Sequence, residues 1–133
     1  MKRNLQNINV TAAIIILAVA ITFSHCVKDK APIECHLPKT VSFSKDIKPI
    51  FNEHCAVSGC HSSGSIQGNL DLSPSVAYSQ LFARYEIDTI NPTHSRLYYR
   101  MNTFSNPMPP SGKLDYCAIQ MVLKWIEQKA KNN

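Results

Sequence analysis

The seven-residue stretch from Cys55 to His61 constrains the fold of this chain more than any other feature. It reads Cys55-Ala-Val-Ser-Gly-Cys60-His61, so two thiols and an imidazole lie close together in a chain of 133 residues. A domain of this size leaves much of its surface unburied, and a disulfide or a bound cofactor adds greatly to its stability. We therefore expect the fold to be built around whatever these three side chains bind.

The order of these side chains matches covalent attachment of haem. Cysteine thiols add to the two vinyl groups of haem, and a histidine directly after the second cysteine becomes an axial ligand of the iron. The usual spacing is Cys-x-x-Cys-His, whereas four residues separate Cys55 from Cys60. The longer loop must bulge, and Gly59 predicts the place because glycine adopts positive φ at little cost.

Two other interpretations of this stretch are open from the sequence alone. Cys55 and Cys60 could form a disulfide that leaves His61 idle in the loop, because thiols of exported proteins oxidise. With His54 as a fourth ligand, the same side chains could bind zinc, although a second spaced ligand pair is missing.

The N-terminal region predicts export. Two basic residues precede an apolar run over 10–23, which is shorter than the roughly 20 residues of a membrane-spanning helix and is typical of a signal peptide. The next residues, Phe23-Ser-His25-Cys26, are similar to a bacterial lipobox, although His25 stands where a small residue is usual. We expect residues 1–25 to be a lipoprotein signal peptide and Cys26 to carry the lipid; an uncleaved anchor helix or an ordinary secretory signal is the alternative.

Residues 26–40 are expected to form a tether, because they contain several charged residues and two prolines. The folded domain is expected over 41–133. The formal net charge is +5, but the basic residues are spread singly, which is typical of a solvated surface and does not indicate a nucleic-acid partner. We expect the protein to be exported and held by its lipid in the cell envelope, in the periplasm or at the outer membrane.

Three short helices are predicted in the first two thirds of the domain. Apolar residues at helical spacing predict one over 47–54, with Ser44 as its N-cap. Ser73-Pro74 predicts the start of a second that continues to Leu81. Asn91-Pro92 predicts a third, with Leu97, Tyr98 and Met101 on one side.

The last predicted helix has the clearest amphipathic pattern. Asp115 is its candidate N-cap and Trp125 is expected at its flank, while the core face consists of Ile119, Val122, Leu123, Ile126 and Ala130. No alternation typical of strands occurs in the chain. The predicted fold class is therefore all-α, with short helices and long loops.

The chain resembles the small c-type cytochrome domains of the planctomycete-type family, in a Bacteroidetes-like lipoprotein variant with the longer cysteine spacing. The resemblance covers almost all of residues 43–130, and its motifs are Phe43-Ser-Lys-Asp-Ile-Lys-Pro-Ile-Phe51, Cys55 to His61, Gly68-Asn-Leu-Asp-Leu72, Ser95-Arg-Leu-Tyr98, Met108-Pro-Pro110 and Trp125-Ile126. It implies a small class I cytochrome c-like fold around one covalent haem c, with Cys55 and Cys60 bound to haem and His61 to iron.

Met108 is the candidate for the second axial ligand. The three prolines around it stiffen its loop, so the thioether can be held toward the iron without helical support, and the family resemblance implies the same role. His–Met ligation gives a higher potential than His–His ligation. Met101 is expected to fill the core instead, and His94 is the other candidate ligand, expected at the surface or at a helix start.

Arg96 and Arg100 lie one helical turn apart and are candidate partners of the haem propionates, which need donors when they are partly buried. Two solvent-facing arginines are the equally plain alternative.

Two cysteines remain once Cys26 is assigned to lipid and Cys55 with Cys60 to haem. Cys35 and Cys117 make an even pair in an oxidising compartment, and we expect a disulfide between them. A buried free thiol at one of the two positions is the alternative.

Three functions are compatible with these features. The first is an electron carrier without enzymatic activity, which docks briefly to redox partner proteins of the cell envelope. The second is a haem enzyme such as a peroxidase, which needs a displaceable sixth ligand and a distal acid or base; no pattern places His54 or His94 in that role. The third is a haem-free structural or binding lipoprotein.

Overall fold

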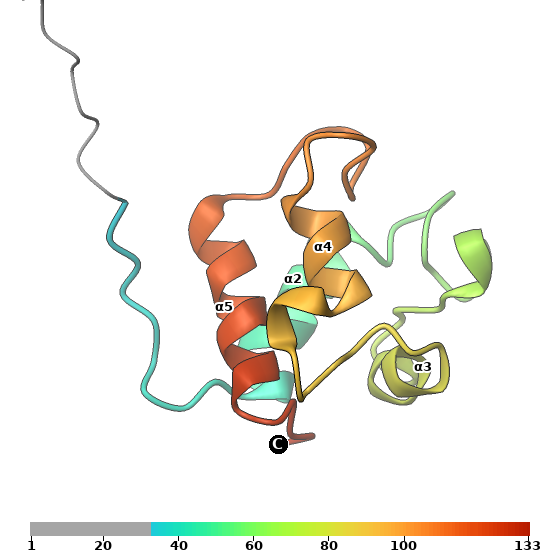
Figure 1. Cartoon of the computed structure of the whole chain (residues 1–133). Helices are drawn as coiled ribbons and strands as arrows, with labels where there is room; N and C mark the ends of the chain where they lie inside the picture. The colour runs from blue at the N-terminus through green and yellow to red at the C-terminus, as the bar shows by residue number, and fades with distance from the viewer. Residues whose placement is uncertain (1–32) are drawn as a thin grey trace, which may run out of the picture. The chain divides into compact units, whose positions relative to one another are not determined.

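The computed structural model describes residues 33–133, so the predicted signal peptide and Cys26 lie outside the described residues. Figure 1 shows the helices in chain order, and their bounds are η1 Phe43–Ile47, α2 Lys48–His54, η2 Gln67–Asn69, α3 Ala77–Ala83, η3 Pro92–His94, α4 Arg96–Asn102 and α5 Tyr116–Glu127. No strand occurs over residues 33–133, which confirms the all-α class for this part of the chain. None of its helices is long and apolar enough to cross a bilayer.

The first helical segment begins earlier than predicted. Ser42, and not Ser44, is its N-cap: the Ser42 hydroxyl accepts the Lys45 N–H at 3.3 Å, and the Asp46 carboxylate accepts the Ser42 N–H at 2.7 Å. This reciprocal pair satisfies two amides that a helix start leaves without partners. The prediction of Ser44 was wrong. Ser44 is the second residue of the helix, and its N–H donates to the Asn133 carbonyl. The helix ends at His54, with Cys55 as the C-cap.

The second helix, α3, begins later than predicted. The prediction made Ser73 the N-cap, but the Ser73 hydroxyl accepts the Ser63 N–H from the preceding loop at 2.9 Å. Residues 74–76 form a turn in which Val76 and Ala77 donate to the Ser73 carbonyl, and the α-helix starts at Ala77. A contact between distant residues has therefore taken the capping oxygen.

The third and fourth predicted helices form as α4 and α5. A turn of 3₁₀-helix, η3, precedes α4, which buries Leu97 and Met101. Asp115 caps α5 as predicted, because its carboxylate accepts the N–H groups of Cys117 and Ala118 at 2.8 and 3.3 Å.

Trp125 lies in the core, and its predicted place at the flank of the last helix was wrong. Its side chain is fully buried, and its ring lies 5.3 Å from that of Phe43 and 6.4 Å from that of Tyr78, measured between centroids. The indole N–H donates to the Lys131 carbonyl at 2.9 Å. Helix α5 therefore buries a wider face than one stripe, because η1 and α4 both pack against it.

The segment before the first helix is held on α5 at two points. Cys35 and Cys117 form a disulfide with 5.4 Å between their Cα atoms, which confirms that prediction. Gln128 adds a second link, because its amide oxygen accepts the Val41 N–H at 2.9 Å and its amide nitrogen donates to the Lys39 carbonyl at 2.8 Å. The described end of the predicted tether is thus joined to the last helix.

Candidate cofactor site

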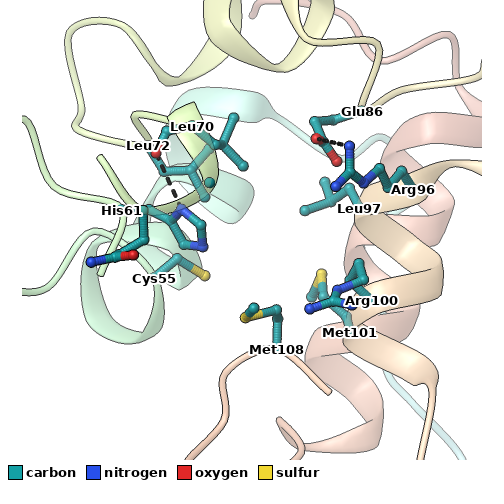
Figure 2. A pocket seen from close by; sticks show the side chains of 12 residues that line it. Cys55, His61, Leu70, Leu72, Glu86, Arg96, Leu97, Arg100, Met101 and Met108 are labelled. Atoms are coloured by element: carbon teal, nitrogen blue, oxygen red, sulfur yellow. Dashed lines mark hydrogen bonds and ion pairs between the residues drawn. The ribbon is translucent and has the colours of Figure 1, made fainter. Parts of the chain in front are cut away.

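A cavity of about 280 Å³ lies between the segment that follows α2 and the face of α4. Figure 2 shows Cys55 and His61 on one side of it, Arg96, Leu97, Arg100 and Met101 on the other, and Met108 reaching in from the loop before α5. A second cavity of about 280 Å³ adjoins the first and shares Cys55, His61, Gln67 and Met108 with it. The structure thus brings Cys55, His61 and Met108 to both cavities, Arg96 and Arg100 to the first, and Cys60 to the second.

The His61 imidazole is fixed by the backbone around it. Its Nδ1 lies 3.1 Å from the Leu70 carbonyl oxygen, and the His61 carbonyl accepts the Leu72 N–H at 2.7 Å. Since a carbonyl oxygen only accepts, Nδ1 carries a proton here, and in the neutral ring Nε2 is the nitrogen with the lone pair. Figure 2 shows the ring projecting into the cavity, so the free nitrogen is available there as a ligand. A hydrogen bond of this kind, from the ring nitrogen that does not bind the metal, orients metal-bound histidines in proteins.

The loop between the two cysteines bulges at the predicted residue. Gly59 has φ +81°, and its N–H donates to the Ser65 hydroxyl at 2.8 Å. The Cys60 N–H donates to the Val57 carbonyl at 3.0 Å, and the His61 N–H returns to the Cys55 carbonyl at 3.0 Å. The two extra residues of the motif are thus absorbed by a turn, which leaves Cys55 beside His61.

Cys55 and Cys60 both carry free thiols in this structure. Cys55 lines both cavities, whereas Cys60 lines the second one together with His54. Burial raises the pKa of Cys55 to about 11, with a smaller contribution from the neighbouring Cys60. The Cys55 thiol is therefore protonated at neutral pH. Among residues 33–133, no group of three or more His, Cys, Asp or Glu side chains is arranged to hold a metal ion.

Met108 is half-buried and lines both cavities. Its N–H donates to the Arg100 carbonyl at 2.8 Å, which ties the loop to α4. Met101, at 2% exposure, is a core residue as predicted and also forms part of the cavity wall. His94 is exposed on η3 and is not among the cavity-lining residues.

Arg96 and Arg100 both reach the cavity from α4. The Arg96 guanidinium lies 3.5 Å from the carboxylate of Glu86, and the two side chains are 69% and 9% exposed. These arginines are therefore part of the wall, and Arg96 already has an anionic neighbour.

Glu86 is a cavity residue that the sequence analysis missed. It is buried, and its backbone is tied at both sides, since its N–H donates to the Leu81 carbonyl and its carbonyl accepts the Leu97 N–H. Burial raises the pKa of its carboxyl, while Arg96, His61 and Arg100 act in the opposite direction. It lies in an irregular segment with no period and no motif, so no sequence signal could have identified it.

The lining of the cavity fits haem c. Its walls are largely apolar, through Leu70, Leu72, Leu97 and Met101, and polar groups enter at a few points, as is usual for small-molecule sites. The sulfur and imidazole donors are of the types that attach and ligate haem, and the arginines offer charge-assisted donors for carboxylates.

Comparison of the chain with protein-family models, with curated proteins and with solved structures gave no match. What this protein does must therefore be argued from its own residues.

Proposed function

We propose that this protein is a c-type cytochrome that carries single electrons in the cell envelope. The observation that supports it best is the convergence of Cys55, His61 and Met108, which come from two segments far apart in the sequence, on one apolar cavity. Held there, haem would supply one-electron exchange at its iron. On this proposal the helical domain has a cytochrome c-like fold of the class I type.

The residues of the chain have separate tasks in this proposal. Cys55 and Cys60 would hold the haem covalently through their sulfurs, and His61 and Met108 would bind its iron. The Leu70 carbonyl, 3.1 Å from Nδ1, would hold the His61 ring in place and leave Nε2 as its ligating nitrogen. Arg96 and Arg100 would offer hydrogen-bond donors to the propionates.

Export and lipidation at Cys26 complete the proposal. They are supported by the short apolar run over 10–23 and the lipobox-like residues that follow it. A lipid anchor would keep the carrier at the membrane surface, where its partners would be other redox proteins of the envelope.

A haem stain after denaturing electrophoresis tests this function. The full chain, expressed in a host with a competent attachment system, should retain haem through denaturation, and a Cys55→Ser, Cys60→Ser double variant should lose it. A Cys35→Ser, Cys117→Ser double variant is the matched control and should keep its haem, because those sulfurs lie outside the cavity. Colourless wild-type protein with unmodified Cys55 and Cys60 thiols would rule out the proposal.

The visible spectrum then separates a carrier from a haem enzyme. A carrier with two side-chain ligands should be low-spin and should not respond to peroxide or carbon monoxide. A Met108→Ala variant should lose the spectral features of thioether ligation, whereas Met101→Leu should keep them. Rapid reaction of the wild type with peroxide would favour the enzyme instead.

A further inference from the structure

The loop that carries Met108 is closed by one lysine. We call residues 103–113 the Met108 loop; it makes up most of the connection between α4 and α5, which Figure 1 shows. At its C-terminal end, the Lys113 ammonium donates to the Asn102 side-chain oxygen at 3.2 Å. The same ammonium lies 4.1 Å from the centre of the Phe104 ring. One side chain thus links the end of the loop to its beginning.

The partners of Lys113 are themselves attached to α4. Asn102 is the last residue of that helix, and its amide nitrogen donates to the Tyr98 hydroxyl at 3.2 Å. In the middle of the loop, the Met108 N–H donates to the Arg100 carbonyl. The loop is therefore fixed to one turn of α4 at its middle and at its closed base.

The two contacts of the Lys113 ammonium are both with residues at or just before the start of the Met108 loop. Its side chain makes no ion pair within the described residues, and it selects a neutral amide and the face of an aromatic ring that is 91% exposed. Cation–π and charge-assisted contacts at exposed sites are individually weak. Because both contacts hold the two ends of the same loop together, they jointly lower the frequency with which the loop opens.

We propose that Lys113 is a positioning residue for Met108: by binding Asn102 and Phe104 it keeps the loop closed and the thioether in the cavity. This inference rests on the proposed function, in which Met108 binds iron. When the loop opens, Met108 leaves the cavity, so the frequency of opening sets the rate at which another ligand can replace it. Lys113 does not touch the cofactor and acts only through the loop.

The first test follows the loop itself and needs no haem. Phe104 is a cleavage site for chymotrypsin, and Met108 forms a sulfoxide when oxidant reaches it. In a Lys113→Met variant of the full chain, cleavage after Phe104 and oxidation of Met108 should both be faster by about fivefold, the size expected for losing two exposed contacts. Lys113→Arg should restore most of the protection.

Matched variants separate the effect of the Lys113 contacts from a general effect of removing a positive charge. Lys131→Met removes an exposed lysine beyond the other end of α5 and should behave as wild type. Asn102→Ala, which removes the acceptor and leaves Lys113 in place, should open the loop, whereas Asn102→Asp keeps an acceptor oxygen and should not. Rates in Lys113→Met and Asn102→Ala that equal those of the wild type would overturn the proposal.

The second test addresses positioning of the ligand. Imidazole should replace the sixth ligand of the haem-loaded Lys113→Met protein about fivefold faster than in the wild type, in proportion to loop opening. Faster cleavage without faster replacement would refute the positioning role. If the preparation carries no haem, the function proposed above fails, and Met108 oxidation still decides whether Lys113 holds that side chain in the cavity.

Discussion

Glu86 is the residue whose surroundings conflict most with its charge. It is 7% exposed on a mostly apolar wall, and burial raises the pKa of its carboxyl above the ordinary 4.5. The Arg96 guanidinium, at 3.5 Å, favours the charged form but is itself 69% exposed, so solvent screens its charge. Arg100 and His61 act weakly in the same direction. The folded protein therefore holds this proton more firmly than the unfolded chain does.

This shift predicts how a Glu86→Gln variant responds to pH. Because the folded-state pKa is raised, the carboxyl favours folding below pH 4.5, and this contribution is lost as the pH rises through the folded pKa. A neutral amide avoids that loss, so the melting temperature of Glu86→Gln should exceed that of the wild type at pH 7 and the two should converge near pH 4. Glu34→Gln, at an exposed position, is the control, and its melting temperature should equal that of the wild type at both pH values. A less stable Glu86→Gln protein at pH 7 would mean that the Arg96 pair outweighs burial.

Residues that line the two cavities could be predicted where they belong to a local motif. Cys55, Cys60 and His61 stand in a short ordered pattern, Gly59 supplies the positive φ of the bulge, and Met108 stands among prolines. Glu86 has no such context. Its place depends on two backbone hydrogen bonds, which its N–H donates to the Leu81 carbonyl and its carbonyl accepts from the Leu97 N–H, and only the folded chain brings these two helices together.

At the scale of elements, the position of a helix start depends on whether the side-chain oxygen of the capping residue binds the first amides of the helix or a distant N–H group. Asp115 caps α5, and over residues 33–133 its carboxylate accepts only from the two amides of that helix start. The Ser73 hydroxyl is taken by the Ser63 N–H, so α3 starts three residues after the predicted first position. Sequence patterns contain the local candidate for each cap but not its long-range competitor. The same limit explains Trp125, since a one-stripe pattern does not reveal that Phe43 covers the flank of α5.

The cap of α5 gives a prediction at this scale. Replacing Asp115 with Ala removes the acceptor of two amides, and should destabilise the protein by about 1 kcal/mol. Asp115→Asn keeps a side-chain oxygen and should lose far less. Urea unfolding followed by circular dichroism measures both. Equal stability of the two variants would show that the carboxylate charge at the helix start, and not the hydrogen bonds, provides the stabilisation.

The whole molecule depends on links between residues that are distant in sequence. The core joins η1, α2, α4 and α5 through one cluster that includes Phe43, Phe51, Leu97 and Trp125. The cavity lies beside that cluster, so its walls are also core side chains such as Leu72 and Met101. All-α class could be predicted from patterns in the sequence, whereas this shared wall could not, because it results from the packing of segments that are separate in the sequence.

The Cys35–Cys117 disulfide is the longest-range covalent link in the described chain, with a sequence separation of 82 residues. Because it restricts the unfolded chain, removing it with a Cys35→Ser, Cys117→Ser double variant should lower the free energy of unfolding by up to about 4 kcal/mol. The Gln128 contacts to Lys39 and Val41 remain in that variant and keep the folded segment in place, so the loss should appear in denaturant unfolding without a change in native circular dichroism. Peptide mapping without reduction should recover Cys35 joined to Cys117 in the wild type; finding both as free thiols in protein exported to an oxidising compartment would contradict the link.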